Sequence, residues 1–450
     1  MNSNTINGFS PLPLGEKIMQ IRKAKGLSME NMACAIKKSQ PFISRFERGE
    51  ADCSAEELEA IKKFLEIENA PLFEHELKFY KSQMWVLHDL LNKTRYQEAD
   101  ALFHKLSSVR ALPFEEELIM LHTMLEIRIL MMEGTQKRHK ESTEAAHETE
   151  KAAEEKLKAA EALINFDTAS DEVLQLYHRN KGLIYVVKMD VMNKIKHFLK
   201  AIDYSTDNIP IDEMLYYHIG CAYLAIGKPF KAIMYLERAK ALCLDGTSRI
   251  LIHININIAS ACINTGELKE AEKLLKESLL HAESMDEVGG KMRIMMHMAE
   301  LCSRANKHEE SIGFLDQATE YAKNYTHALV NILWAKAENL FKLKRTNECN
   351  DVLAHAKKLA VGDELQTLMV ETQIHRTTLD NDDSLHYLEN EAIPYLKKRK
   401  GPFAFYAMDL CRELEAHYLK KRSKMKALIM AAIMRDIYEE AFYWDDGVLG

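Results

Sequence analysis

Residues 14–49 read LGEKIMQIRKAKGLSMENMACAIKKSQPFISRFERG, and this stretch decides how the N-terminal part of the chain folds. Its spacing predicts a first helix over 14–24, ended by Gly26, because glycine adopts the positive φ that closes a helix at little cost. Ser28 is a residue type that caps a helix N-terminus, so a second helix is expected to begin after it. The side chains expected to face inward from these two helices are Ile18, Ile21, Met32, Ala33 and Ile36.

Two further helices are predicted after this pair. Ser39 is expected to cap a third helix, from residue 40 to about residue 48. Ser54 and Glu57 have the S-x-x-E spacing of a capping box, which predicts a fourth helix that ends near residue 65.

Four short helices in this order are typical of a module that places the start of its third helix in the major groove of DNA. Gln40 can pair bidentately with adenine, and Pro41 is tolerated in the first helical turn because its missing N–H would have no partner there. Nearby cations are placed for phosphates, which give affinity without sequence specificity. The predicted DNA contacts are Ser39, Gln40, Pro41, Ser44 and Arg45 around the third helix, and Arg22, Lys37, Lys38 and Arg48 for phosphates. A small helical docking module with a solvated basic face is the alternative interpretation.

The string from Ala33 to Gly49, A-x-x-x-x-x-S-Q-x-x-I-S-R-x-E-R-G, resembles the Xre/Cro-type helix-turn-helix family. The resemblance covers about 55 residues. The family usually has Gln at the start of the second helix, where this chain has Met29, and this departure weakens one predicted phosphate contact.

The net charge of −8 is unevenly distributed along the chain. Between Lys17 and Arg48, eight basic and two acidic residues give +6, so the remainder carries −8 − 6 = −14. An acidic body repels phosphate, so DNA contact is expected to be confined to the N-terminal module.

The 450 residues include only 17 glycines and 9 prolines, so an almost wholly helical protein is expected. No apolar run approaches the ~18 residues that span a bilayer, and the N-terminus lacks a signal-peptide pattern. A cytoplasmic protein without membrane contact is therefore predicted. The eight cysteines are interpreted as reduced core residues, and no metal or cofactor is expected.

The segment Tyr216–Ala239, YYHIGCAYLAIGKPFKAIMYLERA, is the clearest unit of a helical repeat. It is similar to the tetratricopeptide repeat, whose standard period is ~34 residues. Eight or nine helix pairs are expected, stacked into a right-handed superhelix with a concave groove lined by the first helix of each pair. The equivalents of Ala232 recur 35–43 residues apart, at Lys194, Ala271, Ser311, Cys349, Ser384 and Ala427.

The predicted fold class is thus all-α, with an N-terminal helix-turn-helix domain followed by a tetratricopeptide-repeat superhelix. The expected divisions are a disordered N-terminus at 1–13, the helix-turn-helix domain at 14–68 and the repeat domain at 72–450. The charged, alanine-rich stretch 136–162 is expected to be a long exposed helix, or a partly disordered link followed by one.

Polar and aromatic residues occupy the groove-facing positions of otherwise apolar first helices, as an extended peptide requires. Asparagine suits such a groove because its amide can pair with a peptide N–H and C=O at once. An exposed face is polar in any case, so a merely solvated groove is the alternative, and Trp334 could equally belong to the core. The predicted peptide-contacting residues are Arg179, Tyr217, His253, Asn257, Arg293, Glu300, Asn331, Trp334, Glu338, Gln373 and Arg376.

A Cro-type module followed by long-period repeats resembles the peptide-pheromone receptors of Gram-positive bacteria, the Rgg–Rap–NprR–PlcR–PrgX group. The resemblance implies a homodimeric, quorum-sensing transcription regulator that binds a palindromic double-stranded DNA operator and a short signalling peptide, and is not an enzyme. Two alternatives stay open: an adaptor whose repeats dock a protein partner, and a phosphatase-type regulator of a response regulator. The dimer surface is expected at the C-terminus, where an ordinary capping helix is the alternative, at Leu428, Ile429, Ile433, Ile437, Phe442, Tyr443 and Trp444.

Overall fold

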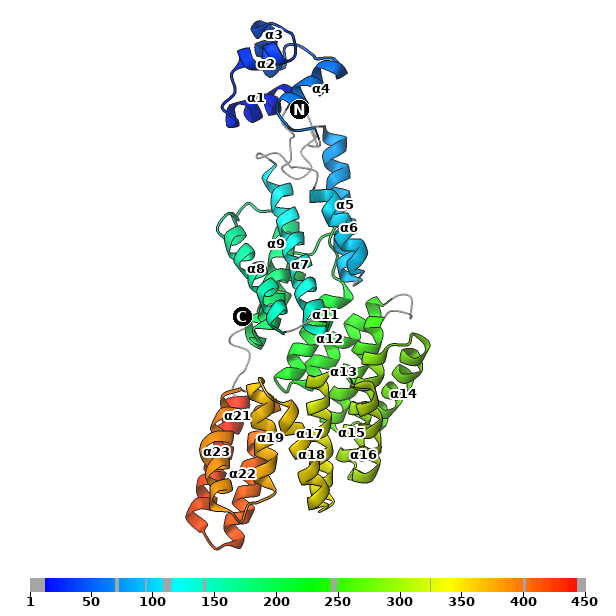
Figure 1. Ribbon diagram of the computed structural model, residues 1–450, viewed down its shortest axis with the longest axis vertical. Coiled ribbons are helices and arrows are strands. Elements are labelled where there is room, and N and C mark those ends of the chain that lie inside the picture. The colour runs from blue at the N-terminus through cyan, green and yellow to red at the C-terminus, as the bar shows by residue number, and fades with distance from the viewer. Residues whose placement is uncertain are drawn as a thin grey trace. The chain divides into compact units, whose positions relative to one another are not determined.

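The computed structural model describes residues 13–68, 73–93, 95–107, 115–140, 143–243, 249–323, 325–399 and 402–442 (Figure 1). Within these ranges every regular element is a helix, which confirms the predicted all-α class. The predicted disordered N-terminus lies outside the described residues except for its last position, and so do Tyr443 and Trp444.

By contacts the chain divides into two compact units. Unit 1 comprises residues 1–188 and 200–211, and unit 2 comprises residues 189–199 and 212–450. The dividing line crosses helix α10 (Val191–Asp203). The predicted division at residues 68–72 is therefore not the one that contacts define, and the domain limits stay a prediction.

Unit 1 begins with the four helices that the N-terminal sequence predicts, namely α1 (Leu14–Ala24), α2 (Met29–Ala35), α3 (Gln40–Glu47) and α4 (Ala55–Phe64). Gly26 has φ +65°, the Ser28 and Ser39 hydroxyls accept N–H groups of their helices, and Ser54 and Glu57 form the predicted capping box. The five predicted inward side chains are all buried.

A close approach of α1 and α3 explains a glycine that the sequence did not single out. A Cβ at Gly15 would lie 1.9 Å from the Phe46 carbonyl oxygen. Only glycine lets the two backbones pass at this distance, so the position of α3 depends on Gly15.

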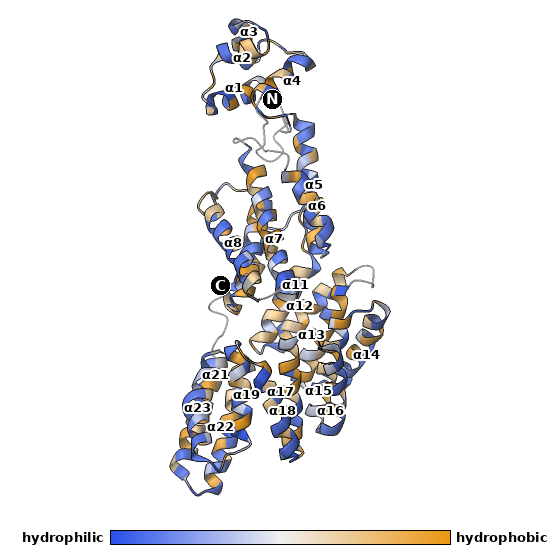
Figure 2. Ribbon diagram, in the orientation of Figure 1, coloured by the Kyte–Doolittle hydropathy of each residue, from blue (hydrophilic) through white to orange (hydrophobic). Residues whose placement is uncertain are grey.

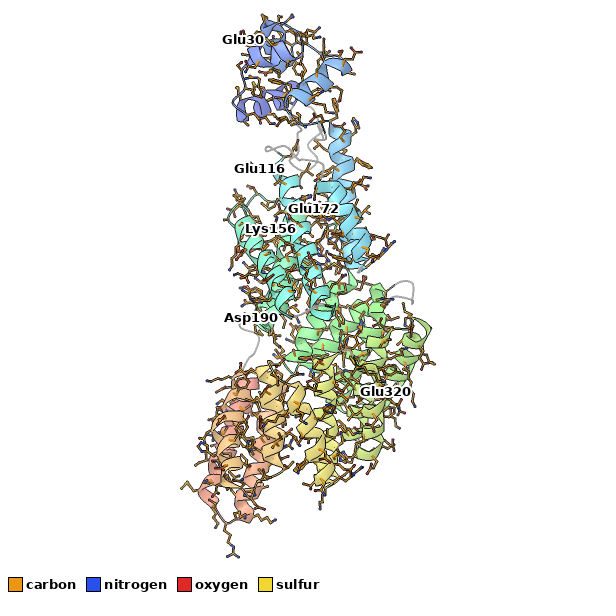
Figure 3. The ribbon with its side chains drawn as sticks, viewed as in Figure 1. Glu30, Glu116, Lys156, Glu172, Asp190 and Glu320 are labelled. Carbon is orange, nitrogen blue, oxygen red and sulfur yellow. The ribbon has the colours of Figure 1, made fainter. Side chains whose placement is uncertain are left out.

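The rest of unit 1 is built from α5 (Glu74–Asn92), α6 (Tyr96–Ser107), α7 (Glu116–Lys140), α8 (Thr143–Glu161) and α9 (Asp171–Val187). The expectation of a single exposed helix over 136–162 is wrong, because this stretch contains the end of α7 and the whole of α8. The alternative, a partly disordered link followed by a helix, falls partly on residues 141–142, which lie outside the described residues. Ala153 and Leu157 of α8 are buried against the shared core. The Lys156 ammonium, labelled in Figure 3, lies 2.5 Å from a Glu126 carboxylate oxygen of α7. The alanines of this charged stretch are therefore packing residues, since small side chains let α8 lie close to α7.

Unit 2 continues as stacked helix pairs, from α11 and α12 to α22 and α23. Figure 2 shows hydrophobic and hydrophilic residues on each helix of this unit, as expected where one face is buried. After α10 the elements are α11 (Glu213–Ala225), α12 (Pro229–Leu242), α13 (Arg249–Thr265), α14 (Leu268–Ser284), α15 (Val288–Arg304), α16 (His308–Tyr321), α17 (Thr326–Lys342), α18 (Thr346–Leu359), α19 (Glu364–Arg376), α20 (Asp382–Tyr387), the π-helix η1 (Leu388–Ala392), α21 (Ile393–Arg399), α22 (Pro402–Lys420) and α23 (Lys424–Phe442).

The repeat period is confirmed by the burial of its small residues. The Ser311 hydroxyl donates to the Ala299 carbonyl at 2.8 Å, and the Cys349 thiol donates to the Ala337 carbonyl at 3.4 Å. Each of these bonds joins the second helix of a pair to the first helix at their crossing. The buried members of the series are Ala232, Ala271, Ser311, Cys349, Ser384 and Ala427. Lys194 is the exception: it is half-buried, and burial lowers the pKa of its ammonium.

Candidate functional site

The start of α3 forms an exposed polar surface in unit 1. Gln40, Pro41 and Arg45 are exposed and Ser44 is half-buried. A protruding glutamine at the start of a helix, with an arginine farther along it, has the geometry needed to reach base edges.

Three cations flank this surface, and two of them already have acidic partners. The Lys38 ammonium lies 2.5 Å from a Glu57 carboxylate oxygen. Arg48 donates to both Glu50 oxygens, and to the Ser44 hydroxyl at 2.6 Å. Lys37, with φ +56°, is exposed. The Arg48–Glu50 pair is exposed, and so is the Lys38 side of the other pair, although Glu57 is only 18% exposed. Exposed pairs are weak, so a phosphate can replace the carboxylate.

Arg22 does not belong to this surface, which corrects its predicted phosphate contact. Its guanidinium donates to both oxygens of Glu47, at 2.6 and 2.8 Å, and to the Leu27 carbonyl at 2.7 Å. Only 6% of Arg22 is exposed. Arg22 therefore joins α1 to α3. Sequence spacing could not reveal this pair, because its members are 25 residues apart.

A cleft of ≈ 950 Å³ opens in unit 2. Most of its wall comes from α15, α17 and α19, which are the first helices of three consecutive pairs, as predicted for the groove. Met189 and Phe403 add apolar side chains. Five predicted peptide contacts line the cleft, namely Arg293, Glu300, Asn331, Trp334 and Glu338.

Three more predicted residues lie behind the cleft wall and hold Arg293. The Arg293 guanidinium donates to Nδ1 of His253 at 2.9 Å and to the Asn257 amide oxygen at 3.2 Å. Tyr217 lies close enough for the Arg293 charge to act on its phenol. Burial, together with the nearby Arg293 charge, lowers the pKa of His253 to about 4. His253 is therefore neutral at pH 7 and accepts the bond.

A buried charge network lies beside Glu338 of α17. Arg376 donates to Glu338 at 2.6 Å, to Glu413 at 2.6 and 2.9 Å, and to the Gln373 amide oxygen at 2.6 Å. Gln373 and Arg376 are 0% and 4% exposed and are not part of the cleft wall. Gln373 and Arg376 therefore position the Glu338 side chain instead of making the predicted peptide contact. Glu413 of α22, which completes the network, carries no sequence signal for this role.

Trp334 lies on the cleft wall, so the interpretation as a purely core residue does not hold. Its indole packs edge-on against Tyr406 with ring centroids 5.7 Å apart. The indole N–H is buried and has no hydrogen-bond partner. Arg179, in contrast, is a buried residue of α9 in unit 1 and is not part of this cleft.

Other cleft residues lay outside the predicted contacts. Helical spacing could have identified two of them on α15. His297 and Arg304 are four and eleven residues after Arg293, so they lie on the same face of the helix. Met369 and Phe403 carry no such signal, since apolar residues occur on every helix of the array.

Comparisons with known proteins agree with this organisation. Residues 18–68 match the family described as Helix-turn-helix. No curated protein sequence gives a match. Among solved structures, a Rap protein complexed with Competence and Sporulation Factor has a TM-score of 0.67 at 14% identity, over 81% of this chain and 99% of that chain. NprR from B. thuringiensis in its apo form has a TM-score of 0.65 at 19% identity, over 81% and 99%. NprR in complex with its cognate peptide NprX has a TM-score of 0.64 at 18% identity, over 80% and 99%.

These likenesses confirm the predicted fold, a helix-turn-helix domain with a repeat array of the Rap and NprR type. At this level of identity they establish the fold alone. No helix within the described ranges combines the length and apolarity needed to cross a membrane.

Proposed function

We propose that this chain, with its helix-turn-helix domain and Rap- and NprR-like fold, is a cytoplasmic transcription regulator whose DNA binding is switched by a short peptide. The observation that supports this most directly is that one chain combines the exposed start of α3 with a cleft of ≈ 950 Å³ in its repeats. Such a volume is at the upper end of ordinary small-ligand pockets.

For DNA we propose that Gln40, Ser44 and Arg45 contact base edges. Lys37, Lys38 and Arg48 contact phosphates, while Arg22 is left out because it is buried against Glu47. A dimer of such domains binds two half-sites of a palindromic operator.

For the peptide we propose an extended backbone along α15, α17 and α19. The Gln366 amide donates to the Asn331 oxygen at 2.9 Å and so orients the Asn331 side chain at the cleft wall. An oriented amide can pair with a peptide N–H and C=O. The solved NprR complex holds its cognate peptide, and we extend peptide binding to this chain by proposal.

We propose that the homodimer forms through the outer face of α23. Met425, Leu428 and Ile429 are 72%, 64% and 48% exposed, which is unusual for three large apolar residues within one and a half helical turns. The helix starts with Lys424 and Lys426 and ends with Asp436, Glu439 and Glu440. An antiparallel second copy therefore sets basic ends against acidic ends.

Two predicted members of this dimer surface have a different place. Ile437 is buried in the core of the C-terminal pairs with 1% exposed, and Ile433 packs against that core. These two residues fix α23 to α22, which leaves the apolar outer face to Met425, Leu428 and Ile429.

Coupling between the two activities requires that the peptide bind two shapes of the array with different affinity. Each repeat contacts mainly its neighbours, so a peptide that spans three first helices changes their mutual angles. A coupling free energy of about 1–3 kcal/mol is typical of such switches.

The test has two arms. The full chain is used to select binding sites from random duplex DNA, and the selected operator is titrated with and without pools of short peptides. We expect a selected palindrome and a shift in its Kd with at least one pool. An operator affinity that stays constant with every pool contradicts the proposal. Capture of one folded protein partner would instead support the adaptor function, and release of phosphate from a phosphorylated response regulator would support the phosphatase function.

A further inference from the structure

We infer that the cleft recognises a carboxylate of its ligand through Arg293, so the peptides it accepts carry an acidic group beside a large apolar side chain. This inference rests on the proposed peptide-binding function and specifies which peptides qualify.

The first observation is a line of charged side chains on α15. Arg293, His297, Glu300 and Arg304 follow one another at helical spacings of four, three and four residues, and all line the cleft. Glu300 lies 3.2 Å from His297. Arg304 is exposed, so water solvates its charge.

The hydrogen-bond partners of Arg293 are neutral. Arg293 donates to His253 and Asn257, and no carboxylate among the described residues forms an ion pair with it. Arg293 is also half-buried. A partly desolvated cation without a counter-ion is costly, and an entering anion relieves that cost.

The neutral partners also orient the guanidinium. His253 and Asn257 each use one N–H, on Nη1 and Nη2 respectively. A guanidinium has five N–H donors in a planar fork, which leaves further N–H groups for the two oxygens of a carboxylate. Because these partners hold the fork in place, little side-chain entropy is lost when the ligand binds.

The acidic side chains of α17 and of the start of α19 disfavour a second location for the carboxylate. Glu338, Asp363 and Glu364 line the cleft from these two places. Arg376 is shared between Glu338 and Glu413, Lys342 lies 3.8 Å from Glu338 and His327 lies 3.5 Å from Asp363. The four carboxylates still outnumber these cations, so the net charge is negative and repels an acidic ligand group. The carboxylate is thus directed to α15, and a basic group or a free N-terminus is favoured near α19.

Apolar side chains also line the cleft and define a further group of the ligand. Met296 lies about one helical turn from Arg293 on α15, and Leu315, Trp334 and Phe403 line the cleft from three other helices. Such a lining stabilises a large apolar side chain by removing it from water.

The carboxylate can be the peptide C-terminus or an Asp or Glu side chain. The experiment uses positional pools of heptapeptides, each made with a free C-terminal acid and with a C-terminal amide, and with Asp replaced by Asn at each position. Binding to the full chain is measured by calorimetry. Loss of affinity with the amide assigns the C-terminus, and loss with Asn assigns a side chain.

We expect the preferred acid to bind at least about tenfold more tightly than its neutral counterpart, as a charge-assisted bond implies. In Arg293→Gln we expect the acid and neutral peptides to bind with about equal affinity. Arg345→Gln is the matched control, since Arg345 lies outside the cleft and pairs with Glu309 and Glu348; it keeps the preference.

The outcomes separate the two proposals. Pools that bind with no preference for acid over neutral peptides overturn the role of Arg293 while leaving peptide binding intact. Pools that do not bind at all overturn both. If Arg293→Gln does not fold, the acid-to-neutral comparison in the unaltered chain still decides whether a carboxylate is recognised, and Arg293→Lys tests its location by a reduced preference.

Discussion

The guanidinium of Arg22 in α1 and the carboxylate of Glu47 in α3 are joined by two parallel hydrogen bonds, at 2.6 and 2.8 Å. Both side chains are less than 10% exposed. The pair therefore fixes the position of the helix that we propose reads DNA, although neither residue needs to contact DNA.

Glu47→Gln tests this support. Removing one partner of a buried ion pair leaves the other charge uncompensated, so the N-terminal domain is expected to lose about 3 kcal/mol of unfolding free energy. Hydrogen exchange of the α1 and α3 amides in the full chain measures the loss. Glu50→Gln is the control, because Glu50 forms only an exposed pair with Arg48; equal exchange in both variants would contradict the supporting role.

Arg45→Ala tests the DNA surface. Arg45 is exposed on α3, and loss of one base-contacting arginine weakens specific binding by about tenfold or more. Fluorescence anisotropy with the selected operator measures this effect, and peptide affinity stays unchanged. Lys63→Ala, on the exposed face of α4, serves as the control. If the two variants bind DNA equally well, Arg45 is not at the interface.

Asn331→Ala tests the peptide site, and here peptide affinity changes while DNA affinity does not. Loss of the oriented amide removes hydrogen bonds to the peptide backbone and weakens peptide binding by roughly three- to tenfold. DNA affinity without peptide is unchanged. Asn350→Ala, which removes an exposed amide of α18 outside the cleft, leaves peptide affinity as it was. Unchanged calorimetric affinity in Asn331→Ala would place the peptide elsewhere.

Leu428→Glu tests the proposed dimer. A charge in the middle of the apolar face of α23 is expected to shift the mass measured by light scattering toward the monomer. Leu280→Glu is a matched control, since Leu280 of α14 is also an exposed leucine, at 69%. A dimer that persists in Leu428→Glu at low micromolar concentration excludes this face.

The pKa of His253 gives a prediction on pH. Its folded value of about 4 lies below the unfolded value of 6.5, so the unfolded chain binds the proton more tightly. Stability is complete above pH 6.5 and declines as the pH falls from 6.5 to 4, by up to about 3 kcal/mol for this residue. His253→Gln, which can still accept from Arg293, should show a smaller decline in thermal unfolding over that window. Identical pH profiles would show that folding leaves the pKa of His253 unchanged.

The parts of the fold that depend on local chemistry were predictable. Ser28, Ser39 and the capping box act within one helical turn. Ala232 and its equivalents, Lys194 excepted, mark the helix crossings with a small side chain. These signals are periodic or local, so a single sequence contains them.

The parts of the site that depend on tertiary contacts were not predictable. Arg22 and Arg293 look alike as isolated cations in a sequence, yet one has a buried carboxylate partner and the other has none. Likewise Arg376 lies on α19, a helix that lines the cleft, and only the structure shows that its side chain bonds to Glu413 instead.

Glu338 lines the cleft and also pairs with Arg376. This double role limits which substitutions at Glu338 can change ligand preference among relatives. Exchange of Glu338 to suit a new signal would take one of its two carboxylate partners from the buried Arg376, so such an exchange favours a compensating change at Arg376 or Glu413. Asn331 and Met369 form no ion pair with a buried charge. Divergence of signalling specificity should accordingly accumulate at those two positions first, while Glu338, Arg376 and Glu413 change only as a set.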